Sequence, residues 1–172
     1  MTTYAVFLRG VNLGPTNKVS MPVLREALTT NGFSDVRTYI NSGNVLLTSA
    51  DSPLEVQSRV ATVIAETFGL TIDVTVRTLD QLRAILEANP FPEGDPSKVT
   101  VAFLIGSPRP DAEERLAALA GEHEPYVFAG TEIYVHYSHG LGKSKLAEKF
   151  SATVGTSATV RNVRTVAKLL DL

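Results

Sequence analysis

Apolar and polar positions in the first half of the chain follow two periods, two residues for strands and three to four residues for helices. Ser20 is suited to start one helix, and Ser52 with Glu55 forms a capping box that starts another. The pattern predicts a strand, a helix, a two-stranded hairpin, a second helix and a last strand, over residues 4–9, 20–31, 36–41, 44–49, 52–68 and 72–77. This β-α-β-β-α-β order is ferredoxin-like.

The same order begins again after a linking helix at 78–89 and the loop N-P-F-P-E-G-D-P-S at 89–97. The pattern there predicts a strand, a helix, a hairpin and a further helix, over residues 99–105, 111–120, 126–129, 132–137 and 143–150. No last strand is predicted, and a C-terminal helix at 160–170 follows from the apolar stripe of Val163, Val166, Ala167 and Leu170.

The expected fold class is therefore α+β, with two ferredoxin-like halves that share a core, the second half incomplete, plus a C-terminal helix. We expect one compact domain over residues 1–172. Within it, residues 1–77 form the first half, 78–97 the linking helix and loop, and 98–172 the second half with the C-terminal helix.

The first hairpin is expected to turn over two residues, Ser42 and Gly43, which would place Asn41 opposite Asn44 and Tyr39 opposite Leu46. Because strand side chains alternate between faces, one face is expected to join the core and the other to be largely polar. The core face would carry Val36, Thr38, Ile40, Val45 and Leu47, and the polar face Arg37, Tyr39, Asn41, Asn44 and Thr48. The polar face could meet water, a ligand or the other half of the protein.

Composition narrows the class of protein. The chain of 172 residues is 44% hydrophobic and 20% charged, a globular balance. Absence of cysteine excludes disulfides, thiolate zinc sites and a cysteine nucleophile. The N-terminal sequence lacks the pattern of a signal peptide, and no apolar run reaches the ~18 residues of a membrane span. We therefore expect a cytoplasmic protein without a membrane partner.

Charge is unevenly distributed along the chain. The formal net charge of −2 argues against general coating of nucleic acid, so a nucleic-acid partner is not expected, though the sequence does not exclude one. Residues 1–77 are neutral, residues 78–130 carry −5 and residues 131–172 carry +3. The C-terminal quarter is therefore where an anionic partner is expected.

The loop R-G-V-N-L-G-P-T-N-K-V-S, Arg9 to Ser20, joins a strand to a helix. Its glycines do not match the spacing of a Walker A loop or of a Rossmann fingerprint. Arg9 and Lys18 nevertheless lie on either side of a turn next to a helix N-terminus, where anions are favoured. The loop is interpreted either as an anion site or as a capped surface loop with solvated charges.

Two later segments are also basic. H-G-L-G-K-S-K-L, His139 to Leu146, could form an anion-binding nest at a helix start or a simple turn capped by Ser144. In T-V-R-N-V-R-T-V-A-K, residues 159–168, the basic side chains of Arg161, Arg164 and Lys168 would share one helical stripe, which is commonly a solvated face. Arg161 and Asn162, in the first turn, are the ones expected to face inward.

Several chemistries find no support in the sequence. His136 and His139 have no nearby carboxylates to complete a metal site, and His123 is assigned to a loop, so no metal ligand is expected. No G-x-S-x-G elbow is present for a hydrolase serine. The aromatic-rich motif of RNA-recognition domains has no counterpart in residues 44–49.

Five segments together resemble the bacterial domain-of-unknown-function family 1697: R-G-V-N-L-G, N-K-V-S-M, V-R-T-Y-I-N-S-G-N-V, and the late S-K-L and T-V-R-N. The resemblance implies a duplicated ferredoxin-like fold and no established activity. It carries over these positions: Arg9, Gly10, Asn12, Lys18, Tyr39, Ser42, Gly43, Asn44, Ser144, Lys145, Arg161 and Asn162. The family pattern has tryptophan where Val163 stands and commonly asparagine where Arg164 stands. If that tryptophan stacks on a ligand, this chain would bind differently or use Val163 only for packing.

Three functions remain open from the sequence. The first is a binding module for a small anionic or phosphorylated ligand, a nucleotide included, contacted by Arg9, Asn12, Lys18, Tyr39, Asn44, Ser144, Lys145, Arg161 and Asn162. The second is a phosphoryl- or acyl-transfer enzyme that uses the basic residues for charge stabilisation but needs a general base from elsewhere in the fold. The third is a homodimeric interaction protein. No cofactor and no catalytic residue is assigned.

Overall fold

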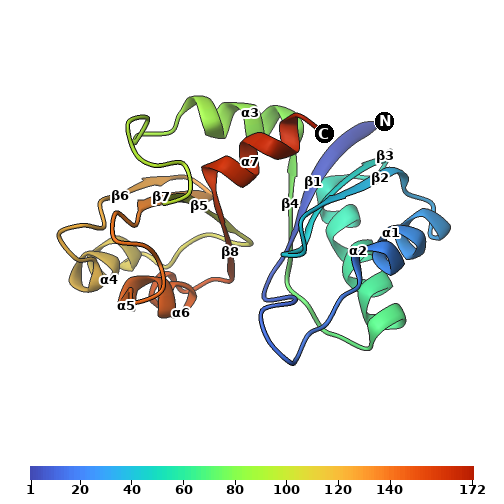
Figure 1. The fold of residues 1–172 in the computed structure, drawn as a ribbon, viewed down its shortest axis with the longest axis horizontal. Coiled ribbons are helices and arrows are strands. Elements are labelled where there is room, and N and C mark those ends of the chain that lie inside the picture. Colours follow the sequence, from blue (N-terminus) through green and yellow to red (C-terminus); the bar gives the residue numbers. More distant parts are fainter. The chain divides into compact units, whose positions relative to one another are not determined.

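A computed structural model describes all 172 residues, and the chain forms two units. The first unit comprises Met1–Ala84 and Lys168–Leu172, and the second comprises Ile85–Ala167. Each unit contains one four-stranded antiparallel sheet with helices (Figure 1). The predicted α+β class with two halves is confirmed, whereas the single domain, its boundaries and the shared core stay predictions.

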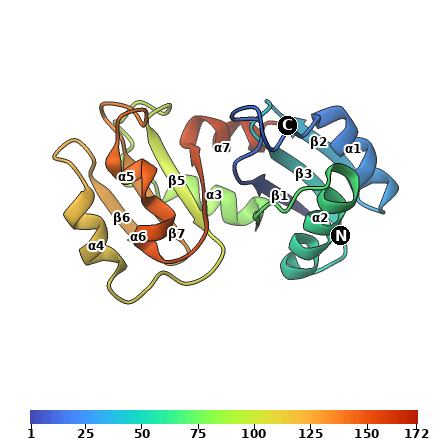
Figure 2. The ribbon, with the colours of Figure 1, turned by 90° about the horizontal axis from the view of Figure 1, so that it is seen from below.

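The first unit has the predicted order of elements. They are β1 (Thr2–Leu8), α1 (Met21–Thr30), β2 (Ser34–Tyr39), β3 (Asn44–Ser49), α2 (Pro53–Phe68) and β4 (Val74–Thr78). The strands lie in the order β2-β3-β1-β4, so that β1 is a central strand. Helices α1 and α2 pack on one face of this sheet (Figure 2).

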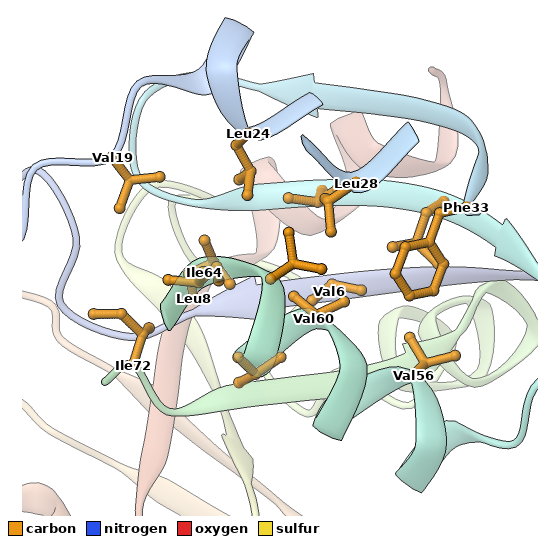
Figure 3. Packing of buried hydrophobic residues seen from close by; sticks show 14 of the residues in the cluster. Val6, Leu8, Val19, Leu24, Leu28, Phe33, Val56, Val60, Ile64 and Ile72 are labelled. Carbon is orange, nitrogen blue, oxygen red and sulfur yellow. The ribbon is translucent and has the colours of Figure 1, made fainter. Parts of the chain in front are cut away.

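Local signals explain both helix starts. The Ser20 side chain accepts a hydrogen bond from the Val23 backbone N–H at the start of α1. Ser52 and Glu55 form the expected capping box at the start of α2, which ends at Gly69 in the left-handed conformation. The apolar face of each helix then packs on the sheet, as Figure 3 shows for Val6 and Leu8 of β1, Leu24 and Leu28 of α1, and Val60 and Ile64 of α2.

The register of the first hairpin differs from the prediction. Tyr39 pairs with Asn44, and Arg37 pairs with Leu46, so the loop spans four residues, 40–43, instead of two. Ile40 leaves the strand at a φ of 49° and is 54% exposed, which corrects its expected core position. The Asn44 side chain closes the longer turn, because its amide donates to the Tyr39 carbonyl oxygen at 3.1 Å and to the Ser42 hydroxyl at 2.9 Å.

Because the register shifts by two residues, the side chains that stay in the two strands keep their expected faces. Val45 and Leu47 join the core as predicted. Asn44 and Leu46, on the face expected to be largely polar, are fully buried as well, at 0% and 1% exposure. Strand β3 is therefore buried on both faces.

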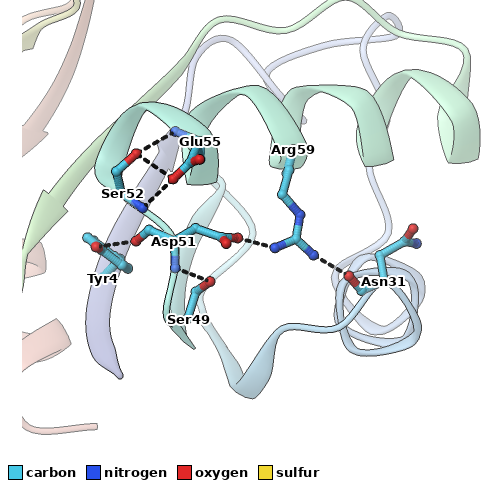
Figure 4. A network of polar contacts seen from close by, with 7 residues as sticks. All are labelled: Tyr4, Asn31, Ser49, Asp51, Ser52, Glu55 and Arg59. Atoms are coloured by element: carbon cyan, nitrogen blue, oxygen red, sulfur yellow. Dashed lines mark hydrogen bonds and ion pairs between the residues drawn. The ribbon is translucent and has the colours of Figure 1, made fainter.

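A polar network joins both helices to the end of β3 (Figure 4). Arg59 of α2 donates hydrogen bonds to the Asp51 carboxylate and to the Asn31 carbonyl oxygen after α1. The Tyr4 hydroxyl donates to the Asp51 carbonyl oxygen at 2.7 Å. Hydrogen bonds from the Arg59 guanidinium and then from the Ser49 side chain hold the pKa of Asp51 below its ordinary value.

The second unit is built from β5 (Val99–Leu104), α4 (Ala112–Leu119), β6 (Tyr126–Ala129), β7 (Glu132–His136), α5 (Lys145–Glu148), α6 (Phe150–Val154) and β8 (Ala158–Asn162). Its strands lie in the order β6-β7-β5-β8, which matches the first unit strand for strand. Its core gathers apolar side chains from strands and helices alike, among them Leu104, Leu116, Ile133, Phe150 and Val154.

Strand β8 corrects the prediction of an incomplete second half. Residues 158–162 pair antiparallel with β5, from Ala158 opposite Leu104 to Asn162 opposite Thr100. The predicted helix at 160–170 consequently begins later, as α7 (Val163–Leu170), with the Asn162 side chain accepting from the Thr165 N–H at 2.9 Å. Arg161 lies in the strand, so it does not share a helical stripe with Arg164 and Lys168.

Other helices deviate less from expectation. The helix expected at 143–150 is two short helices, α5 and α6, and the linking helix is α3 (Leu79–Glu87). Asp111 precedes α4 but makes no capping hydrogen bond, because its carboxylate contacts Arg109 and Arg115. None of the helices combines the length and the apolar composition that crossing a bilayer requires.

We predict that Gly43→Ala destabilises the protein more than Gly10→Ala. Both glycines have positive φ, 86° and 69°, where a Cβ costs ~1–2 kcal/mol. A Cβ at Gly43 would also lie 2.8 Å from side-chain carbons of Leu8 and Val11, whereas nothing lies within 4 Å at Gly10. Urea unfolding should therefore show a further loss of about 1–3 kcal/mol in Gly43→Ala. Equal losses would contradict this close packing.

We also predict that Asp51→Asn flattens the acid dependence of stability. A carboxyl group whose pKa is lowered by folding stabilises the protein above its unfolded pKa of about 3.9, and this contribution is lost as the pH falls through the folded pKa. Urea unfolding between pH 6 and pH 2 should show wild type losing its advantage over Asp51→Asn below pH of about 4. Parallel curves over this range would contradict the prediction.

Candidate functional site

Arg9 follows β1, and its guanidinium lies 3.5 Å from the Asp73 carboxylate. The two side chains are 42% and 51% exposed, so the ion pair is a surface pair of small energy. An anion that binds Arg9 would have to compete with Asp73. Lys18, at the other end of the loop, is exposed and forms no ion pair.

Asn12 determines the shape of the loop between them. Its backbone has a φ of 57°, and its side-chain amide donates to the carbonyl oxygens of Val19 and Asn41, both at 2.8 Å. Its side-chain oxygen accepts from the Val19 N–H at 2.9 Å. Asn12 thus closes the loop on itself and joins it to the turn at 40–43.

Tyr39 and Asn44 are neighbours across the hairpin, as the register requires. Tyr39 is half-buried and Asn44 fully buried, and the Asn44 amide donates within the turn. In the first unit the structure therefore brings Asn12 next to the turn between Tyr39 and Asn44. Their contact with a ligand stays a prediction.

Arg161 and Asn162 lie in β8, opposite Val101 and Thr100 of β5. Burial lowers the pKa of Arg161 to about 10, so its guanidinium stays charged at neutral pH. Its Nη1 donates to the Val160 carbonyl oxygen at 3.0 Å. Asn162 caps α7, and Val163, where the resemblance alone implies a tryptophan in the family, is buried at 8% exposure.

Ser144 and Lys145 line a pocket of about 460 Å³ in the second unit. The lining comes from two segments, residues 119–124 at the end of α4 and just after it, and residues 139–145 after β7. These segments are distant in sequence but adjacent in space, because β6 and β7 form a hairpin whose open end brings them together. At that end the Ser138 N–H donates to the His123 carbonyl oxygen at 3.1 Å.

A hydrogen bond between Ser144 and Glu124 ties the two segments to each other. The Ser144 hydroxyl donates to the Glu124 carboxylate, whose other oxygen accepts from the Gly121 N–H at 2.9 Å. The Ser144 oxygen in turn accepts from the Ala147 N–H at 3.1 Å, which caps α5. Burial, together with the charge of Glu124, raises the pKa of the nearby Tyr137 phenol.

The pocket also holds two stacked imidazoles that sequence reasoning did not pair. The rings of His123 and His139 lie with centroids 3.9 Å apart at an angle of 29°. The sequence interpretation considered His139 with His136, but His136 instead lies 5.8 Å from the Phe91 ring. No local spacing signals the pairing, because it depends on the β6–β7 hairpin.

Charges of both signs surround the pocket. Lys143 and Lys145 contribute ammonium groups that form no ion pair, and Glu122 and Glu124 contribute carboxylates. The Glu124 carboxylate is already bound to Ser144 and Gly121, whereas Glu122 is exposed. No group of three or more His, Asp or Glu side chains able to hold a metal ion occurs in the structure.

Comparisons with known proteins give a family and a similar structure. The model of a family described as "Protein of unknown function (DUF1697)" matches residues 1–134. A solved structure of the conserved bacterial protein SP0830 from Streptococcus pneumoniae is similar, with 27% identity and a TM-score of 0.73, over 99% of this chain and 97% of that chain. No curated protein matches. The family match includes the first lining segment of the pocket and ends before the second.

We predict that Asn12→Ala destabilises the first unit more than Asn17→Ala does. Both asparagines have positive φ, 57° and 52°, but Asn12 makes three short side-chain hydrogen bonds, while Asn17 makes one of 3.4 Å. At about 0.5–1.5 kcal/mol per hydrogen bond, Asn12→Ala should cost roughly 1–3 kcal/mol more. Urea unfolding measures the difference, and similar losses in both variants would show that the amide does not support the loop.

Proposed function

Because the chain belongs to the DUF1697 family of proteins of unknown function, the family supplies no activity, and we propose that the protein binds a small phosphorylated ligand in the pocket of the second unit. One observation carries the proposal. Two unpaired ammonium groups, those of Lys143 and Lys145, line a pocket of about 460 Å³, a volume within the usual range for small-molecule sites.

The two lysines suit phosphate. An ammonium group binds phosphate as a point charge, and in this pocket neither lysine has to leave a carboxylate in order to do so. The carboxylate between the two segments, Glu124, is held by the Ser144 hydroxyl and the Gly121 N–H, which leaves the lysines available. Ser144 thus acts by holding Glu124 and by positioning the loop that carries both lysines.

Glu122 opposes an anion in the same pocket. Its carboxylate is exposed and has no hydrogen-bond partner, so its charge reduces the favourable potential of the lysines. A change that removes this charge should therefore strengthen phosphate binding. This opposite sign makes Glu122 a useful probe of whether binding is electrostatic.

For the other residues singled out in the sequence, contact with a ligand stays a prediction. In the first unit these are Arg9, Asn12, Lys18, Tyr39 and Asn44, and in the second Arg161 and Asn162. The order and pairing of the strands support a ferredoxin-like interpretation of both units. The homodimer stays a prediction.

A transfer enzyme is the second candidate, and it is favoured by the contact of the Glu124 carboxylate with the Ser144 hydroxyl. This pair, with His123 and His139 in the same pocket, places a potential base where the sequence indicated none. Turnover of a phosphorylated ligand that stops in Glu124→Gln, while binding persists, would favour the enzyme over the binding module.

We predict that Lys143→Gln and Lys145→Gln each weaken binding of inorganic pyrophosphate about tenfold, which is ~1.4 kcal/mol. Each variant removes one of the two charges that attract the ligand. Thermal shift and isothermal titration calorimetry measure the effect, since a ligand at 100-fold its Kd should stabilise the native state by ~2.7 kcal/mol.

Two further variants serve as controls for this experiment. Lys149→Gln removes an exposed lysine of the same unit that does not line the pocket, and it should bind as wild type does. Glu122→Gln should bind more tightly. Equal loss in all lysine variants would indicate a general charge effect, and no binding by wild type would overturn the proposal.

A further inference from the structure

The stacked imidazoles of the pocket point to a more specific ligand. We infer that the phosphorylated ligand is a nucleoside phosphate, whose base stacks on the His123–His139 pair while its phosphate lies at Lys143 and Lys145. The inference rests on the proposed function, because it identifies the group attached to the phosphate as a nucleoside.

The imidazole pair offers an aromatic surface without a structural use. The two rings lie at 3.9 Å and 29°, so each covers one face of the other, and both residues remain exposed. Neither side chain makes a hydrogen bond within the protein or an ion pair. Because the rings neither fill the core nor satisfy a buried group, the outer face of each ring and the ring nitrogens are available to a ligand in the pocket.

Aromatic side chains are the usual partners of nucleobases. Every base has a π face, so stacking on aromatic rings adds affinity with little dependence on which base is bound. The stacked pair leaves the outer face of each ring uncovered, so a base that lies on either outer face would extend the stack. A sugar phosphate or inorganic phosphate would leave this surface unused.

One of the two imidazole rings and both ammonium groups come from one short segment of the chain. His139 precedes Lys143 by four residues, and Lys145 follows two residues later, while His123 is supplied by the opposite segment. The Glu124–Ser144 hydrogen bond holds the two segments together. A single ligand in this pocket can therefore meet the aromatic pair and the ammonium groups at once, which requires a planar ring and a phosphate in the same molecule.

The test compares adenosine 5′-monophosphate, ribose 5-phosphate, adenosine and inorganic phosphate by isothermal titration calorimetry. Adenosine 5′-monophosphate should bind at least tenfold more tightly than ribose 5-phosphate. His123→Ala and His139→Ala should remove this difference while leaving ribose 5-phosphate binding unchanged. His139→Phe, which keeps a flat ring, should preserve the difference in affinity. Lys145→Gln should weaken binding of adenosine 5′-monophosphate and of ribose 5-phosphate by the same factor.

Proton NMR supplies a second readout. If the base stacks on the pair, the adenine H2 and H8 signals should move upfield on binding to wild type and less so on binding to His123→Ala. If His123 supported only the fold, ligand bound to His123→Ala would show the same upfield shift of these signals as ligand bound to wild type.

The outcomes separate the two proposals. If adenosine 5′-monophosphate and ribose 5-phosphate bind with equal affinity and Lys145→Gln weakens the binding of both, the nucleoside inference is overturned and phosphate binding stands. If adenosine binds as tightly as its monophosphate and the lysine variants bind normally, the phosphate proposal is overturned. If none of the four ligands binds, both are overturned.

Discussion

Burial of one central strand organises each unit. In the first unit β1 pairs with β3 on one side and β4 on the other, and in the second β5 pairs with β7 and β8. All six residues of β5, and all residues of β1 from Tyr4 to Leu8, are buried. A strand buried on both faces must have its backbone groups paired by its neighbours, so the positions of the other strands follow from it.

The paired strands hold the ends of the loops that connect them. In the first unit the loop after β1 is closed by the hydrogen bonds of Asn12, which also join it to the turn after β2. In the second unit the β6–β7 hairpin brings together the segments that line the pocket, and the contact of Ser144 with Glu124 fastens them. Both arrangements use a polar side chain to fix a loop, and the second lies beside a pocket lined by two lysines that form no ion pair.

The basic residues singled out in the sequence have different surroundings in the structure. Arg9 faces a carboxylate at 3.5 Å, Arg161 is half-buried in a strand, and Lys145 lines the pocket without an acidic partner. The same charge is therefore balanced by an acid, desolvated, or available to a ligand, depending on neighbours that are distant in sequence. Among these, availability within a pocket is the condition that a phosphate site requires.

Sequence alone determined the elements whose signals are local. The helices begin at Ser20 and at Ser52 with Glu55 because each cap bonds to a backbone group within three residues, and the α-β order follows from the spacing of apolar positions. The tertiary structure alone decided three features: the four-residue turn at Ile40–Gly43, the strand character of residues 158–162 and the meeting of His123 with His139. Each depends on pairing between distant segments, where a cross-strand partner outweighs the local preference of the chain, so neither spacing nor composition could indicate it.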